Sequence, residues 1–492
     1  MELATLLVFA VVSFIVYLWY RRSDSRLPPS PLRALPIVGH LFYMDSDTRP
    51  QFKKWREQCG DIFSLNMCGT KVVVLSGYDL IKEALVKKAD VFSDRPPFFF
   101  DQATGLGEKG VIFSNGKNWK EQRSVALYIL RTFGMGKNLL ALKIQEEVDN
   151  YVEYLASQKG NPTNISLQTN ISTSNVICSI LIGHRFEYDD QDFQNLIHKL
   201  GTLATEQQTV SLVNFMFWLK YLPGDFFRAK KLTAHFDTIL NLLEKFIKET
   251  KQNMTDGNEA SNFIEAYIMD REKKIKSGLP TDLDDKNLLK IVNDLFQAGT
   301  ETTSTTIYWC ILFILNNPGV QEKIYQEIKD NVGRERTPTM QDKNQLTYLN
   351  AVIHETQRLG SIVPLSVTHI CSEDITLRGY NVPKGAYILP NLDSVLFDKT
   401  TWGEDADNFR PERFIDNNGK LNVPEQFIPF STGRRVCLGE ALAKMELFLF
   451  LSSMFQRFQF LPPTPDSIPP LDYKCGVVIV PKPYKVRVVE RK

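Results

Sequence analysis

The chain has no excess of charge of either sign, because 58 lysines and arginines face 57 aspartates and glutamates and leave a formal net charge of +1. A strongly basic surface would indicate a polyanionic partner, so this balance gives no argument for nucleic-acid binding. Cysteine is sparse as well. The seven cysteines are odd in number and scattered without C-x-x-C pairs, which indicates a reducing compartment rather than a disulfide framework.

The interior also lacks a linker. No Gly/Ser-rich or Pro-rich stretch divides residues 41–492, although the length of the chain alone would suggest about three domains. We therefore expect one large domain. Hydrophobic residues make up 43% of the chain and aromatic residues 11%, including 32 phenylalanines. This content is enough to build a large core around an apolar ligand.

An uncharged apolar run of 18 residues, Leu3 to Tyr20, opens the chain and is followed at once by Arg21 and Arg22. The run is long enough to span a bilayer as a helix, with its last aromatics at the interface. It is longer than a secretory h-region and no A-x-A-like site follows, so we expect an uncleaved anchor over residues 1–22. A cleaved signal peptide is the alternative. The positive-inside rule then places the bulk of the chain in the cytoplasm.

A proline-rich stretch, residues 23–40, follows the expected anchor and cannot be helical. We expect it to be stiff and extended and to space the globule from the membrane as a hinge. Apolar alternation on both sides of a Gly-Thr pair predicts a β-hairpin over residues 61–75. Residues 98–116, rich in Phe and Gly, are expected to form a loop, and residues 475–480 a strand of a terminal hairpin. The sequence thus predicts a small sheet.

One cysteine stands in a distinctive stretch. Cys437 lies between Gly433 and Gly439, and an apolar helical run begins just after it. Exposed amides and the helix dipole favour a thiolate at a helix start, so we expect Cys437 to be prepared to ligate a metal or to attack an electrophile. Arg435 offers a cation suited to a carboxylate, and Gly439 lets a flat group approach the chain. A buried free cysteine before a helix is the alternative.

A long apolar run without proline, residues 288–315, predicts a buried helix that is interrupted at Gly299 and a cluster of hydroxyl residues. Threonine hydroxyls can bond back to the carbonyl one turn earlier, which loosens the helix and admits water. Ala298, one turn before Thr302, leaves room on the same face for a bound diatomic molecule. A buried helix that its hydroxyls merely bend is the alternative.

Two further spacings place polar groups on one helical face. Trp119 and Arg123 are four residues apart, so the indole N–H and the guanidinium can bind one carboxylate, although surface packing is the commoner use of such a pair. Glu355 and Arg358 stand three residues apart and can pair. His369 would more often be a satisfied polar residue than a ligand. Each pattern is weak alone and gains weight beside the cysteine stretch.

The pattern F-x-x-G-x-R-x-C-x-G at residues 430–439 resembles the cysteine-ligand loop of the cytochrome P450 haem-thiolate monooxygenases. Further segments are similar to that family's motifs and occur in its order: W-x-x-x-R at 119–123, A-G-x-E-T at 298–302, E-x-x-R at 355–358 and P-x-R-F at 411–414. In character the chain is most similar to the animal microsomal family 2 enzymes. The resemblance implies the cytochrome P450 fold, mainly α with a small β region (α+β), over residues 41–492 and preceded by a transmembrane anchor helix.

The resemblance also implies the site. Haem b would be the cofactor, with the Cys437 thiolate as the axial ligand of its iron. The donors that would bind the haem propionates are Arg95, Trp119, Arg123, His369 and Arg435. Ala298 would lie against the cofactor, and Thr302 and Glu301 would be the catalytic pair that manages dioxygen and its protons. Gln297 is bulkier than the glycine of many relatives, which alters the local pocket shape.

A buried triad of Glu355, Arg358 and Arg413 is implied as well, with the structural role of holding the cysteine loop against the core. A second feature without catalytic chemistry is the aromatic cluster at residues 215–227. Core packing is its default explanation, and a second membrane contact that guards an entrance to the pocket is the competing hypothesis.

The implied reaction inserts one oxygen atom from O₂ into a lipophilic small molecule: a steroid, a fatty acid or a xenobiotic. Because no nucleotide-binding fingerprint is present, electrons from NADPH would arrive through NADPH–cytochrome P450 reductase, docked on a basic face with Arg131, Lys137 and Arg434. Cytochrome b5 is a further expected partner, and the endoplasmic reticulum membrane the expected location. Two alternatives stay open, a haem-thiolate isomerase acting on peroxides and a non-catalytic haem carrier or sensor.

Overall fold

The structure, a computed structural model, describes residues 26–134, 138–205, 213–254 and 259–491 together with residues 5, 7, 10, 11, 13 and 14. Its named helices are α2 (Thr48–Cys59), α3 (Tyr78–Lys82), α4 (Ala89–Phe92), α5 (Phe99–Ala103), α6 (Gly116–Thr132), α7 (Asn138–Ser157), α8 (Ser166–Leu181), α9 (Gln191–Thr205), α11 (Ala229–Asn253), α12 (Phe263–Lys276), α13 (Asp285–Asn316), α14 (Pro318–Asn331), α15 (Thr347–Gly360), α16 (Asp393–Leu396), α17 (Lys399–Trp402) and α18 (Glu440–Arg457). Short helical turns are η1 (Leu41–Tyr43), η2 (Glu83–Lys87), η3 (Phe217–Tyr221), η4 (Met340–Asn344) and η5 (Pro411–Phe414).

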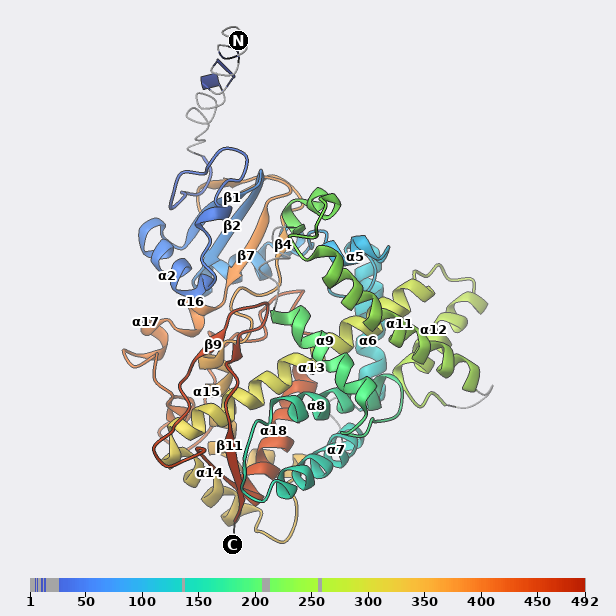
Figure 1. Cartoon of the computed structure of the whole chain (residues 1–492), viewed down its shortest axis with the longest axis vertical. Coiled ribbons are helices and arrows are strands. Elements are labelled where there is room, and N and C mark those ends of the chain that lie inside the picture. Colours follow the sequence, from blue (N-terminus) through green and yellow to red (C-terminus); the bar gives the residue numbers. More distant parts are fainter. Residues whose placement is uncertain are drawn as a thin grey trace.

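The strands are β1 (Ile62–Met67), β2 (Thr70–Ser76), β3 (Pro162–Thr163), β4 (His369–Ile370), β5 (Ile375–Leu377), β6 (Tyr380–Val382), β7 (Tyr387–Asn391), β8 (Phe458–Leu461), β9 (Tyr473–Lys474), β10 (Val480–Pro481) and β11 (Val486–Glu490). The predicted hairpin is confirmed, because β1 and β2 are antiparallel and Phe63 stands opposite Val74. The main sheet has the order β1-β2-β7-β4. It lies at the end of the molecule where the chain begins, and the C-terminus lies at the opposite end (Figure 1). The fold is therefore mainly helical with a small β region, as the sequence predicts.

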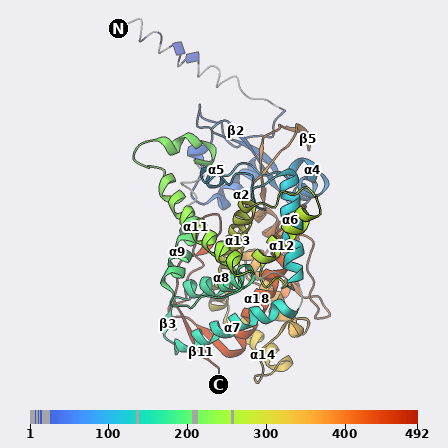
Figure 2. The same cartoon turned by 90° about the vertical axis from the view of Figure 1, so that its right-hand side faces the viewer.

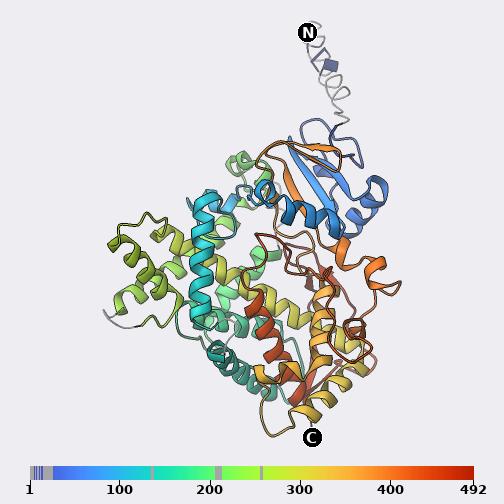
Figure 3. The same cartoon turned by 180° about the vertical axis from the view of Figure 1, so that it is seen from behind.

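Helices form the body below this sheet. α13 crosses the middle of the molecule, and α8, α9 and α11 lie to one side of it (Figure 1). In the side view α12 lies beside α6, against which it packs (Figure 2). Seen from behind, the cyan helix α6 and the red helix α18 are exposed to view (Figure 3). α13 packs against both α8 and α18, so it is the centre of the helical layer.

The central helix is as long as predicted and is not interrupted. Asp284 precedes its first turn and accepts a main-chain hydrogen bond there, and Pro318 opens the next helix just beyond its end. The expected break at Gly299 is wrong, because α13 is helical throughout residues 285–316. The glycine instead admits a neighbour: a Cβ at residue 299 would lie 2.5 Å from Cδ1 of Ile177 in α8. Gly299 therefore sets how closely α8 packs on α13.

The predicted charge triad is confirmed. The Glu355 carboxylate accepts from Nε of Arg358 at 2.7 Å and from Nε of Arg413 at 2.9 Å, and all three side chains are buried. The role assigned to the triad needs correction. The remaining N–H groups of both arginines donate to main-chain oxygens within residues 396–408, so the triad fastens that segment to α15 and η5 rather than the cysteine loop.

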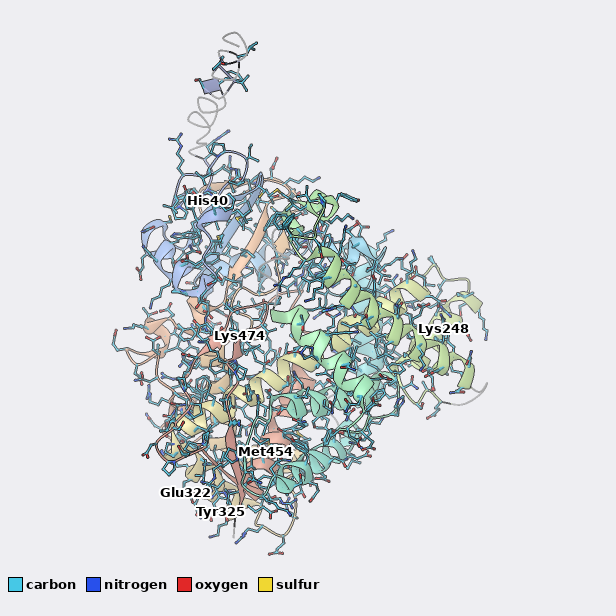
Figure 4. All side chains as sticks on the ribbon, viewed as in Figure 1. His40, Lys248, Glu322, Tyr325, Met454 and Lys474 are labelled. Atoms are coloured by element: carbon cyan, nitrogen blue, oxygen red, sulfur yellow. The ribbon has the colours of Figure 1, made fainter. Side chains whose placement is uncertain are left out.

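The proline-rich segment is part of the globule from residue 26 on. The main-chain N–H of Ser64 in β1 donates to the carbonyl of Pro29 at 2.8 Å, and its hydroxyl donates to that of Pro28 at 2.7 Å. His40, labelled at the sheet end in Figure 4, hydrogen-bonds to Asn66. The segment is thus bound to the sheet and is not a free spacer. The expected anchor lies mostly outside the described residues. Among the helices that the structure describes, none has the length and apolarity that a bilayer crossing requires.

Two local predictions are wrong. The expected loop at residues 98–116 contains a short helix, α5. The expected strand at residues 475–480 is mostly the connection between β9 and β10. The reason lies in the core: the main-chain N–H of Ile479 donates to the Ile362 carbonyl, and its own carbonyl accepts from the Trp309 indole at 2.9 Å. The apolar run therefore turns inward to the core instead of pairing as a strand.

Candidate functional site

The cysteine loop, residues 430–439, leads directly into α18. The main-chain N–H of Cys437 donates to the carbonyl oxygen seven residues earlier at 3.1 Å, which closes the loop. Gly433 has a φ of +82°, and a Cβ there would lie 2.1 Å from the carbonyl oxygen of Leu85, so only glycine fits. At Gly439, by contrast, no other part of the described chain comes within 4 Å of where a Cβ would stand. The loop therefore packs tightly against the protein at Gly433 and has free space beside it at Gly439.

Cys437 has exposed surface, although protein atoms surround its thiol on most sides. Burial raises the pKa of this thiol, while the main-chain N–H groups of Gly439 and Glu440 and the charge of Arg123 lower it. The sequence predicted that the helix start would favour the thiolate. The donors are in place, but burial is the larger effect, so that prediction is wrong for the protein alone. A coordinating metal ion deprotonates a thiol outright.

The middle of α13 has one open position on an otherwise buried helix. Ala298 is exposed and Thr302, one turn later, is partly exposed, whereas residues 303–315 are all buried. The hydroxyl of Thr302 donates to the carbonyl oxygen of Ala298 at 2.7 Å, which is the back-bond that the sequence predicted. α13 also packs against α18, the helix that begins just after Cys437.

Glu301 stands beside this face and is nearly buried. Its Oε1 has no hydrogen-bond partner among the described residues. Burial raises the pKa of the Glu301 carboxyl to about 7, against a smaller opposing effect of hydrogen bonding with Asn170. A carboxyl with such a pKa can hold and release a proton near neutral pH.

Three of the predicted donors gather around the start of α6 and the cysteine loop. The guanidinium of Arg435 lies over the ring of Trp119, 3.9 Å from its centroid, and its Nε donates to the carbonyl of Ser93 at 2.8 Å. Nη2 of Arg123 donates to the carbonyl of Val436 at 2.7 Å. The two arginines are close enough that each positive charge disfavours the other, so they share one site.

The other two predicted donors lie on the adjacent sheet edge. Nη1 of Arg95 donates to the carbonyls of Val367 and Thr368, the two residues before His369. Nδ1 of His369 bonds to the carbonyl of Phe92 at 2.7 Å, so this nitrogen is the donor in the neutral ring and Nε2 faces the site. The charge of Arg435 acts on Arg95 and on His369, which joins both groups of donors into one cluster.

This cluster carries an excess of positive charge, because the Asp94 carboxylate that acts on Arg435 is outnumbered by the three arginines. Within the described residues, Arg95, Arg123 and Arg435 form no ion pair with an acidic side chain, and three of the cluster's buried nitrogens lack partners: Nε of Arg95, Nε1 of Trp119 and Nε2 of His369. Burial lowers the pKa of Arg435 to about 9. Burial, and then the charges of Arg435 and Arg123, lower the pKa of Arg95 well below its usual value. Buried cations of this kind need an anion, and carboxylates are suited to arginine.

The donor set therefore fits iron protoporphyrin. Its two propionates match the unpaired cations, its flat ring matches the space beside Gly439, and its iron matches a thiol that faces the interior. Sequence reasoning missed two residues. The side chain of Asn115 accepts from the main-chain N–H of Arg95 and from Arg435, and Asn170 contacts Glu301. The contacts of Asn115 and Asn170 join segments far apart in the chain, so the sequence pattern does not reveal them. The one signal in the sequence was the position of Asn115 just before the helix that contains Trp119.

Comparison with known proteins agrees with this fit. The family model described as Cytochrome P450 matches residues 28–488. The chain is similar to cytochrome P450 2D6 of Homo sapiens, with 37% identity over 495 residues and 98% of each chain covered. It is 38% identical to cytochrome P450 2J1 of Oryctolagus cuniculus over 99% of this chain and 96% of the relative, and 36% identical to cytochrome P450 2B19 of Mus musculus over the whole of both chains. The chain belongs to the cytochrome P450 family and is a monooxygenase that uses haem b.

Proposed function

We propose that this chain is a membrane-bound haem-thiolate monooxygenase that hydroxylates lipophilic small molecules and draws its electrons from NADPH through a flavoprotein reductase. The observation that carries the proposal is the joint presence of an interior thiol at Cys437 and an unpaired cation cluster at Arg95, Arg123 and Arg435. A cation cluster alone would suit many anions. Together with the thiol it suits a metal porphyrin with two carboxylates.

In this proposal Cys437 is the axial ligand of the haem iron, and Arg95, Trp119, Arg123, His369 and Arg435 hold the propionates. Once bound, haem supplies the activation of dioxygen, from which one atom enters the substrate and the other leaves as water. The propionates would also relieve the repulsion among the cations. Burial lowers the pKa of His369, as do the charges of Arg95 and Arg435, and the negative charge of the propionates would oppose the effect of those two charges.

Glu301 and Thr302 are proposed as the catalytic pair. The buried carboxyl of Glu301 holds a proton near neutral pH and can give it up without a strong base. The hydroxyl of Thr302 lies one turn from Ala298 on the open face of α13, where its lone pairs can orient a water. Ala298 keeps that face clear because its side chain is a single methyl group. These residues would deliver protons while the surrounding core excludes other water.

An aromatic wall supports an apolar substrate. The rings of Phe98 and Phe113 are stacked with centroids 4.4 Å apart, and Phe100 stacks on Phe236 of α11 at 5.4 Å. Phe98 and Phe113 are only partly buried, so part of each ring is available to a ligand. Gln297 donates to the side chain of Asn293 at 2.6 Å, so its amide is held along the helix. Steroids, fatty acids and xenobiotics are the proposed substrate classes.

The proposed organisation is a membrane anchor over residues 1–22, a proline-rich segment over 23–40 and a catalytic domain over 41–492, at the endoplasmic reticulum membrane and facing the cytoplasm. Exposed aromatics near the sheet end support a second membrane contact, since Tyr221 and Phe226 are 77% and 80% exposed. The side chain of Trp218 lies outside the described residues.

The proposed partners are NADPH–cytochrome P450 reductase and cytochrome b5, and the proposed docking site is the basic face of the protein. Arg131 is exposed there. Arg434 is exposed too but pairs with Asp90, so it would contribute less free charge than the sequence suggested. Lys137 lies outside the described residues. Reversing the charge of Arg131 should raise the reductase concentration needed for turnover.

A carbon monoxide difference spectrum tests the centre of the proposal. The reduced protein should show the thiolate-type Soret band, and Cys437→Ala should lose it while keeping its fold by circular dichroism. Product formation with NADPH and reductase then separates a monooxygenase from a non-catalytic haem carrier or sensor. A peroxide isomerase would turn over without reductase, and the presence of Glu301 and Thr302 on the open helix face argues for dioxygen activation instead.

A further inference from the structure

The Asn170 side chain joins α8 to Ser304 of α13, one turn from Glu301. Its Oδ1 accepts a hydrogen bond from the hydroxyl of Ser304. Because Oδ1 is occupied in this way, the amide N–H₂ is the group that remains to donate, and hydrogen bonding with Asn170 lowers the pKa of Glu301. Glu301 and Ser304 are three residues apart on one helical face. The Asn170 amide is thus fixed to the helix that carries the proposed catalytic pair, beside Glu301.

Asn170 acts on the carboxyl without help from any charge. Burial and Asn170 are the two influences on the pKa of Glu301. The titratable side chains of the packed helices, Cys178 in α8 and Asp192, His198 and Lys199 in α9, do not shift it, and no charged group of α11 or α13 does so either. A single neutral amide is therefore the group in the described structure that favours the ionised carboxyl.

Asn170 lies nearer to the surface than Glu301 does. Asn170 is partly exposed, whereas Glu301 is only 8% exposed. A Cβ on Gly201 of α9 would lie 3.6 Å from Oε1 of Glu301, so α9 passes close to this oxygen and leaves no side chain over it. Glu301 lies between the open face of α13 on one side and the edge of α8 and α9 on the other.

We propose that Asn170 is a positioning residue for the monooxygenase reaction, whose amide, held in place by Ser304, keeps the Glu301 carboxyl at the inner end of the proton-supply route. The inference rests on the proposed catalytic role of Glu301. In each delivery the Glu301 carboxylic acid gives one proton toward the Thr302 side of the site. The carboxylate that forms is stabilised by the Asn170 N–H, and a water molecule returns the proton.

The test compares an isosteric variant with a neighbour that serves as a control. Asn170→Asp keeps the oxygen that accepts from Ser304 but removes the N–H donor and adds a negative charge, and Asn170→Ala removes both groups. Ser174→Ala is the matched control, because Ser174 lies one turn along α8 and its hydroxyl bonds to the main-chain carbonyl of Asn170 at 2.6 Å and to the hydroxyl of Thr300 at 3.1 Å, but does not act on Glu301. All three are made in the full-length protein and again together with Glu301→Gln.

The first readout is the pH at which Glu301 ionises, followed by infrared difference spectroscopy of the protonated carboxyl, a signal that Glu301→Gln removes. This readout needs no turnover. Asn170→Ala should raise the titration midpoint by about one pH unit and Asn170→Asp by more, because a donor to the carboxylate is lost. Ser174→Ala should leave the midpoint unchanged.

The second readout is coupling, the fraction of NADPH electrons recovered in product. Coupling should fall several-fold in both Asn170 variants and not in Ser174→Ala. In the Glu301→Gln background the Asn170 variants should cause no further loss. An unshifted midpoint, or an equal loss of coupling with and without Glu301, would overturn the role of Asn170 and reduce it to packing. If Glu301→Gln itself keeps normal coupling, the proposed catalytic role of Glu301 fails and this inference falls with it.

Discussion

Two buried clusters of charge in this protein contain almost the same residue types and differ in one respect. The triad of Glu355, Arg358 and Arg413 contains its own anion, and its spare N–H groups reach main-chain oxygens. The cluster around Arg95, Arg123 and Arg435 bonds to main-chain oxygens and forms no ion pair within the described residues, and the Asp94 carboxylate offsets only part of its charge. We call a cluster complete when it contains the carboxylate that its arginines need, and incomplete when it does not. A complete cluster can only hold the fold together, whereas an incomplete one must receive its anion from outside the chain. This difference separates a structural arginine from a ligand-binding one without any bound ligand.

The largest expected effect is on the complete cluster. Arg358→Ala leaves Glu355 buried without its main partner and should lower the free energy of unfolding by about 3–5 kcal/mol, measured by urea denaturation. Arg410→Ala is the matched control, because the Arg410 side chain is about half exposed and pairs with Asp405 at the surface. It should cost only about 0–1 kcal/mol. Equal losses from both variants would mean that the triad has no special structural weight.

Removing an arginine from the incomplete cluster should have opposite effects on two properties. It should not destabilise the haem-free protein, but it should weaken haem binding. Arg95→Met removes one uncompensated buried charge, so the haem-free protein should unfold no more easily, and at higher denaturant if anything. The same variant should bind haem about tenfold or more weakly, because a charged donor to a propionate is lost. Haem transfer to apomyoglobin measures this loss, with Arg434→Met as control. Destabilisation of the haem-free protein by Arg95→Met would show that the cluster is complete after all.

A third buried cluster, made of Lys290, Asp101 and Asp294, extends the comparison, because its two carboxylates accept different numbers of hydrogen bonds. Lys290 pairs with Asp101 and Asp294, but only Asp294 also accepts from the main-chain N–H groups of Val111 and Ile112. Asp294→Asn should therefore lower the free energy of unfolding by about 1–3 kcal/mol and Asp101→Asn by less. Thermal unfolding of the two variants side by side checks the order, and the reverse order would contradict it.

The last expected effect is a change in a pH slope rather than a fixed loss of stability, and it concerns an acid that is buried without a cation. Burial raises the pKa of Glu446 from its usual 4.5 to about 8, so the folded protein holds this proton more tightly than the unfolded chain. Between those two pH values the folded state binds more protons, and its stability falls as pH rises, by at most about 1.4 kcal/mol per pH unit for one such group. Glu446→Gln should flatten this decline in unfolding measurements between pH 5 and 8. An unchanged slope would mean that Glu446 ionises normally.

Much of the site was predictable because its signals are local. The cysteine loop, the back-bond of Thr302 and the pairing of Glu355 with Arg358 depend on residues within a few positions of each other, and the structure contains all three. The prediction for the Cys437 thiol failed because burial depends on packing by distant segments. Asn170 was missed for the same reason, since its contact with Glu301 joins residues more than a hundred positions apart.

The hydrogen bond that Thr302 donates to the Ala298 carbonyl decides whether this hydroxyl can donate to, or only accept from, a ligand. A hydroxyl has a single hydrogen, and here the helix already uses it. Toward the cavity, Thr302 can therefore present only its lone pairs, so a water or peroxide beside it would point a hydrogen at the threonine. To act as a donor, the side chain must first give up the helical carbonyl, at about 1 kcal/mol. Rotation about a single bond would then turn the Thr302 hydroxyl from a hydrogen-bond acceptor into a donor toward the site.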